Sequence, residues 1–256
     1  MKNNKLLLSM SIDAMFLALI ALFSYVPYLG YITIGPISFT TIHLLVLVGA
    51  LFFGKAKGAL YGLFMGIFSL LVCIQYPGTV NYFFLNPFVS VLPRVIFGFL
   101  SGLIFDILRK RLNFKSFLAL SAPICGLLTL FHTLITLSSL YVFGVLDIFK
   151  ITSLIPGYED IMNGILGMFT TFWNFLLLFV APGAVCETAA AIIISPAIMG
   201  ALYNVVIKSN FVRNGLVIEF ENENKIRIQY VYILIAICLI ITIILCGLII
   251  GNSFKN

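Results

Sequence analysis

Long, almost uncharged runs of apolar residues recur along the chain, and they limit its fold more than any other feature. A helix needs about 20 apolar residues to cross the hydrocarbon core of a bilayer. Runs of about this length lie near 9–27, 39–54, 57–74, 88–108, 117–143, 182–207 and 229–250. Of the 256 residues, 62% are hydrophobic and 9% are charged, against about 25% charged in a soluble domain. Because lipid offers the backbone no hydrogen-bond partners, these runs predict an all-α polytopic membrane protein.

The first apolar run resembles a secretory signal peptide, because a basic start precedes it in MKNNKLLLSMSIDAMFLALIALFSY. Asp13 interrupts the run, and no clean A-x-A cleavage site follows it. We therefore expect a retained first span, with cleavage as the alternative.

Lysine and arginine positions orient the spans, since these residues concentrate in cytoplasmic loops. The apolar stretch 164–181 could cross the membrane or lie along its outer surface. With a cytoplasmic N-terminus and 164–181 outside, twelve of the 15 basic residues are cytoplasmic: Lys2, Lys5, Lys55, Lys57, Arg109, Lys110, Arg111, Lys115, Lys208, Arg213, Lys225 and Arg227. If 164–181 crossed, nine basic residues would be cytoplasmic and five would be outside. We therefore predict the first arrangement in a cell membrane, and the net charge of +6 reflects topology rather than nucleic-acid binding.

This arrangement divides the chain into a six-helix membrane domain over 1–207, a cytoplasmic polar linker over 208–228, and a further span with a short tail over 229–256. The loops 28–38, 75–87 and 144–163 are expected outside.

Gly49–Ala56 nearly matches a P-loop, but Ala56 replaces the Ser or Thr that holds Mg²⁺, and the first glycine lies in an apolar span rather than after a strand. We reject a nucleotide site here. The five cysteines show no C-x-x-C spacing, so neither a zinc site nor a disulfide framework is suggested. No metal or cofactor is expected.

Polar residues inside the spans are the candidates for a binding site. Arg94 is the only charge between Pro87 and Ile104, and insertion scales put an arginine at a helix centre at about +2.5 to +3.5 kcal/mol. Glu187 lies a few residues into the run 182–207. Both are near the outer side, so they could line one cavity, or they could form a structural ion pair with each other. The expected substrate-binding residues are Arg94, Asn86, Tyr82, Phe83, His132 and Glu187, whereas His43 is expected to be a hydrogen-bonded residue within the bundle.

Two stripes of small residues can let helices approach closely in lipid. The first span carries Ser11, Ala14, Ala18 and Ala21 on one face, and the third carries Gly58, Gly62 and Gly66 at steps of four. Each stripe could pack inside the bundle or against another subunit.

Four segments together resemble the vitamin-binding S components of energy-coupling factor (ECF) transporters. They are ISFTTIHLLVLVGALFFGKAKGALYGLFMGIFSLL, NPFVSVLPRVIFGFLSGLIF, LLTLFHTLITLSSLYVFG and PGAVCETAAAIIISPAIMGAL. The resemblance covers roughly residues 9–207 and is closest to the branch that contains folate and pantothenate binders.

This resemblance implies a six-helix bacterial membrane protein that binds a vitamin near its outer face. Such a subunit docks through its first helices on a T subunit, which is coupled to two ATPases. Ala14 and Ala18 match the docking A-x-x-x-A of that family. The chain departs from the family in the additional helix 229–250 and at Phe131–His132, where relatives often carry Thr-Asn.

The leading hypothesis is therefore a substrate-capture subunit rather than an enzyme. A guanidinium matches a carboxylate in a bidentate fork, so Arg94 favours an anionic vitamin, pantothenate before folate. A membrane enzyme is one alternative, and Glu187 and His132 are its only candidate catalytic groups. A self-sufficient secondary transporter is another, although such proteins commonly show inverted repeats and none is apparent here.

Overall fold

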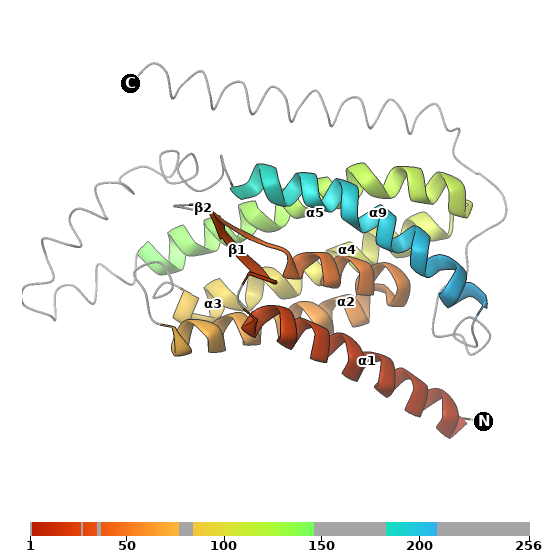
Figure 1. Ribbon diagram of the computed structural model, residues 1–256, viewed down its shortest axis with the longest axis horizontal. Helices are drawn as coiled ribbons and strands as arrows, with labels where there is room; N and C mark the ends of the chain where they lie inside the picture. The colour runs from red at the N-terminus through yellow and green to blue at the C-terminus, as the bar shows by residue number, and fades with distance from the viewer. Residues whose placement is uncertain (1, 27, 35–36, 77–83, 146–182, 209–256) are drawn as a thin grey trace, which may run out of the picture.

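The computed structural model describes residues 2–26, 28–34, 37–76, 84–145 and 183–208 (Figure 1). Its elements are α1 (Lys2–Tyr25), β1 (Tyr31–Ile34), β2 (Ile37–Thr40), α2 (Ile42–Gln75), α3 (Pro87–Ser90), α4 (Leu92–Arg109), α5 (Phe114–Ser139), the π-helix η2 (Leu140–Val145) and α9 (Val185–Lys208). Five of the described helices are long and apolar enough to cross a membrane: α1, α2, α4, α5 and α9. The expected multi-pass α-helical membrane protein is confirmed at this level. The segments 164–181, 209–228 and 229–250 lie outside the described residues.

Helix α2 turns back on itself at Gly54, whose φ of 83° lies in the left-handed region that favours glycine. The two limbs then pack against each other. A β-carbon added to Gly58 would lie 2.8 Å from the β-carbon of Ala50, and one added to Gly49 would lie 2.5 Å from the ring of Tyr61. The runs predicted at 39–54 and 57–74 are therefore the two limbs of α2. The rejected P-loop match, Gly49–Ala56, forms this bend between helices.

Helix α4 holds the bend closed through its last turn. The buried Arg109 donates from Nη1 to the carbonyl oxygen of Phe52 at 3.1 Å and also pairs with Asp106. Asp106 accepts a hydrogen bond from the backbone N–H of Lys55 at 3.2 Å. These bonds satisfy backbone groups that the broken helix leaves without a helical partner. We call this end of the bundle, with the bend at Gly54 and the last turn of α4, the basic end.

The glycine stripe of α2 packs inside the bundle, against the backbone of α4. A β-carbon on Gly62 would lie 2.1 Å from the carbonyl oxygen of Arg94, and one on Gly58 would lie 2.3 Å from that of Gly98. One on Gly66 would lie 2.7 Å from the α-carbon of Val91. Only residues without a side chain allow two helix backbones to approach this closely. The alternative that this stripe contacts another subunit is thus wrong.

The small-residue stripe of α1 has the opposite placement. Ile12, Phe16 and Ile20 are buried against the other helices, whereas Ala14 and Ala18 lie on the exposed face of α1. Asp13, which interrupts the apolar run, accepts hydrogen bonds from Lys57 and from the hydroxyl of Tyr61. This pairing satisfies the carboxylate and fixes the rotation of α1 on α2.

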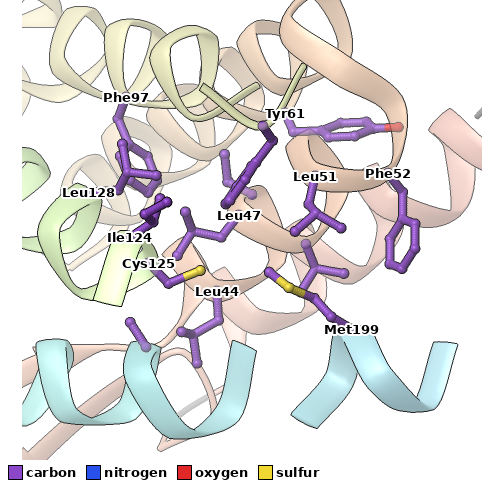
Figure 2. Close-up of a cluster of buried hydrophobic side chains, with 14 of the residues drawn as sticks. Leu44, Leu47, Leu51, Phe52, Tyr61, Phe97, Ile124, Cys125, Leu128 and Met199 are labelled. Carbon is purple, nitrogen blue, oxygen red and sulfur yellow. The ribbon is translucent and has the colours of Figure 1, made fainter. Parts of the chain in front are cut away.

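The hydrophobic core joins α2, α4, α5 and α9. Leu47 and Tyr61 of α2 meet Phe97 of α4, Cys125 of α5 and Met199 of α9 in one buried cluster (Figure 2). Cys125 serves there as a small apolar residue, and Cys73 is also buried, whereas Cys186 is exposed.

A β-hairpin lies between α1 and α2, where the sequence predicted only a loop over 28–38. Strands β1 and β2 pair antiparallel, with Tyr31 opposite Thr40. The chain enters the hairpin at Gly30, where a β-carbon would lie 1.9 Å from the carbonyl oxygen of Phe23. Thr41 closes the base by donating to the carbonyl oxygens of Gly30 and Leu29. We call this end of the bundle, with the hairpin, α3, η2 and the first turn of α9, the hairpin end (Figure 1).

Candidate substrate-binding site

The run predicted as one span at 88–108 is interrupted near its start, and Arg94 lies at the interruption. Helix α3 ends at Ser90 and α4 begins at Leu92. Pro93 has no N–H to donate to the carbonyl oxygen of Val89. Arg94 supplies the missing donor, because its Nη1 donates to Val89 O at 2.9 Å and to Ser90 O at 2.6 Å.

The rest of the Arg94 guanidinium lies in a buried, partly aromatic environment. The side chain is 6% exposed, and its Cζ atom lies 5.4 Å from the centre of the Phe84 ring. Its Nε has no hydrogen-bond partner among the described residues. The charge acts on the phenol of Tyr31 in β1, whose pKa is nevertheless raised, because burial outweighs the arginine.

Arg94 and Glu187 do not form the ion pair that the sequence left open. The described part of the chain contains ion pairs only between Lys57 and Asp13 and between Arg109 and Asp106. Glu187 instead binds Thr40, accepting from its backbone N–H at 2.7 Å and from its hydroxyl at 2.8 Å. Its second oxygen accepts from the hydroxyl of Thr133 at 3.3 Å. Glu187 therefore ties the first turn of α9 to the end of the hairpin and to α5.

The two histidines of the chain lie together in the bundle. The ring centres of His43 in α2 and His132 in α5 are 6.3 Å apart, and the ring of Phe97 lies 4.7 Å from that of His132. His43 is fully buried, and its Nδ1 lies 3.5 Å from the hydroxyl of Thr40. Neither ring nitrogen of His132 has a partner in the part of the chain that the structure describes.

Buried polar atoms without partners among the described residues thus occur on four helices, α2, α4, α5 and α9. Those of the described residues near the hairpin end are His43 Nε2, Arg94 Nε, both ring nitrogens of His132, Thr136 Oγ1 and Thr188 Oγ1. Leaving a buried polar group unpaired costs about 1–3 kcal/mol, and most native structures contain few such atoms. A cluster of them is typical of a site that a polar ligand or water completes.

The predicted site residues divide into three groups in the structure. Arg94, His132 and Glu187 come together around this cluster. Asn86 lies at the N-cap of α3, where its side-chain oxygen accepts from the N–H of Phe88 at 3.0 Å. Tyr82 and Phe83 lie outside the described residues.

The structure adds four residues to the candidate site that the sequence did not single out as substrate-binding, namely Thr40, His43, Thr136 and Thr188. His43 was expected to be an ordinary bundle residue. Threonines in apolar helices commonly bond to their own helix, as Thr129 does with the carbonyl oxygen of Cys125. No local pattern distinguishes these threonines from site residues.

The chemistry of the site is hydrogen-bonded recognition. Among the described residues, no group of three or more His, Cys, Asp or Glu side chains could hold a metal ion. The site offers one guanidinium, two imidazoles and several hydroxyls to a small molecule. Such an arrangement, buried within apolar helices, defines a multi-pass membrane protein that binds a polar solute.

Comparison with known proteins identifies the family. Residues 8–199 match the family described as "ECF transporter, substrate-specific component", and the chain belongs to it. This is a family of transporter components and not of enzymes. A stretch of 119 residues is 33% identical to the pantothenate transporter PanT of Leuconostoc mesenteroides subsp. mesenteroides. The match covers 44% of this chain and 58% of that relative.

Proposed function

We propose that the protein captures pantothenate at the outer face of the cell membrane, as the substrate-binding subunit of an ECF importer. The cluster of unpaired polar atoms around His43, Arg94 and His132 is the observation that carries this proposal. The cluster lies inside the membrane-spanning part, and a polar ligand would supply the partners that the described residues do not provide.

Pantothenate fits this chemistry better than thiamine does. It carries a carboxylate for Arg94, and its two hydroxyls and one amide can bond to imidazole and threonine groups. Thiamine is a cation, so a buried guanidinium disfavours it. The name of the Leuconostoc relative supports the same ligand, and folate, which also carries carboxylates, is the second candidate.

Calorimetric titration of the purified protein tests the proposal. We expect pantothenate to bind saturably with one site, and thiamine to show no heat of binding. Mass spectrometry of the protein purified from cells without added vitamin should identify pantothenate as the bound molecule. Folate, or a molecule without a carboxylate, in its place would contradict the assignment.

We propose that the two limbs of α2 cross the membrane separately, so that residues 1–207 form six spans, with 229–250 as a seventh. The N-terminus and the basic end are then cytoplasmic, and the hairpin end faces outward. The lysine and arginine bias supports this orientation, together with the position of Lys55 at the same end as Arg109.

Cysteine labelling tests the orientation. In a variant without the five native cysteines, a cysteine at Asn222 should resist a membrane-impermeant maleimide in intact cells and react after lysis. A cysteine at Tyr28, which is exposed at the hairpin end, should react in intact cells and serves as the matched control. Ready labelling at Asn222 from outside would show that 164–181 crosses the membrane.

We further propose that the exposed face of α1 with Ala14 and Ala18 docks on a T subunit that works with two ATPase subunits. This face is open in the structure, whereas the comparable glycine face of α2 is filled by α4.

A further inference from the structure

We propose that His43 is a ligand-binding residue that accepts a hydrogen bond through Nε2 from a hydroxyl or amide N–H of the bound vitamin. This inference deepens the proposed function and rests on it. It concerns the end of the ligand that Arg94 does not bind, and it predicts that this end carries a neutral hydrogen-bond donor.

The argument begins with the protons that Thr40 can donate. Its backbone N–H and its hydroxyl both lie within hydrogen-bond distance of Glu187 Oε1, at 2.7 and 2.8 Å. A threonine hydroxyl has one proton, and Thr40 Oγ1 donates it to Glu187 Oε1. The hydroxyl proton therefore points at Glu187, and Thr40 Oγ1 can act toward His43 only as an acceptor.

This favours one neutral tautomer of His43, the one protonated at Nδ1. Its Nδ1 lies 3.5 Å from Thr40 Oγ1, and Nδ1 must carry the proton in order to donate to that oxygen. In a neutral imidazole the other nitrogen then has a free lone pair and no proton. His43 Nε2 is thus an acceptor, and the partner that completes it must be a donor.

Nothing in the described chain supplies that donor. His43 is 0% exposed, and its Nε2 has no partner among the described residues. The neighbouring His132, 6.3 Å away between ring centres, also has both nitrogens unpaired. An anionic carboxylate has no proton to donate to Nε2, so the carboxylate of the ligand would bind to Arg94 and not to His43. The site therefore selects a molecule with an anionic end and a neutral hydroxyl- or amide-bearing end.

The experiment compares pantothenate with two deoxy analogues, each lacking one of its two hydroxyls, and with a third in which the amide nitrogen is methylated. Affinities are measured by calorimetry for the intact protein and for His43→Leu, His43→Gln and Thr40→Val. Ser101→Ala is the matched control, because it removes a buried hydroxyl that bonds only to Phe97 in its own helix. Thermal unfolding of every variant identifies those that fail to fold.

We expect the intact protein to bind one of the three analogues at least about tenfold more weakly than pantothenate, because a buried acceptor loses its donor. His43→Leu should bind pantothenate more weakly by a similar factor. This variant should bind that analogue and pantothenate with the same affinity. His43→Gln, which keeps an amide oxygen at a similar reach, should recover part of the discrimination. Thr40→Val should reduce this discrimination, because without the Thr40 hydroxyl His43 can adopt either neutral tautomer. Ser101→Ala should leave the discrimination unchanged.

The outcomes separate this inference from the function on which it rests. If the intact protein does not bind pantothenate, the proposed function fails. If it binds pantothenate and a folded His43→Leu variant discriminates the analogues as the intact protein does, the role of His43 is wrong and the function stands. An intact protein that binds all three analogues as tightly as pantothenate would also contradict the role of His43.

Discussion

Pantothenate binding is expected to fall by well over tenfold when Arg94 is replaced with alanine. Removing one partner of a buried, hydrogen-bonded charge pair costs about 2–5 kcal/mol. The same change leaves Val89 O and Ser90 O without their side-chain donor, so the thermal stability should fall as well. Calorimetry and thermal unfolding of the purified variant measure the two effects.

Arg94→Lys separates the two roles of the side chain. An ammonium group has three donors and can still bond to the two carbonyl oxygens, but it lacks the fork that matches a carboxylate. We expect this variant to regain most of the stability and little of the affinity. A lysine variant that binds pantothenate as tightly as the intact protein would show that the guanidinium only supports the break between α3 and α4.

A second replacement tests whether Glu187 is the hidden partner of Arg94. Because Glu187 bonds to Thr40 and Thr133 and not to Arg94, Arg94→Ala/Glu187→Ala should be less stable than Arg94→Ala alone. Recovery of stability in the double variant would instead indicate an ion pair.

Vitamin uptake is expected to drop at least about tenfold, toward background, when Ala14 or Ala18 is replaced with tryptophan. Close approach of helices in lipid depends on small residues at the contact, and an indole on this face would hold a partner helix away. Binding of pantothenate by the purified subunit should not change, because the face lies on the outside of α1. Uptake of labelled pantothenate by cells that contain the whole transporter measures the loss.

Ile193→Trp is the matched control for this replacement. Ile193 is 70% exposed on α9, so the same indole enters an exposed position on a different helix. Uptake should be retained. If Ala14→Trp and Ala18→Trp also retained uptake, the stripe would not be a docking face.

The spans could be predicted from the sequence because a bilayer imposes one length on every helix that crosses it. The runs at 9–27, 117–143 and 182–207 correspond to α1, α5 with η2, and α9 within a few residues, apart from the earlier start of α1. The hairpin was missed because Tyr31–Thr40 is short and rich in turn residues at its centre. Its strands depend on contacts with α1 and α9 that no local pattern encodes.

The site was predicted less well, for a reason that Arg94 illustrates. The sequence indicates that Pro93 frees the carbonyl oxygen of Val89, and the structure shows that oxygen bonded to Arg94. Whether a long side chain folds back on its own helix or reaches across depends on its neighbours, which sequence spacing does not reveal. Glu187 raises the same difficulty, since its main partner, Thr40, lies 147 residues away in the chain.

The glycine contact between α2 and α4 holds one half of the bundle together, and α5 packs on α9 in the other half. A β-carbon on Gly62 would lie 2.1 Å from Arg94 O, so the second limb of α2 and α4 pack backbone against backbone on one side of the site. His132 and Thr188 belong to α5 and α9, on the other side of the site. A vitamin that bonds to both sides acts as a removable cross-link between the halves. At a hundred times its dissociation constant, such a ligand would add about 2.7 kcal/mol to the stability of the fold. The loaded subunit would be the stiffer one, and a partner that senses stiffness could distinguish full from empty without touching the vitamin.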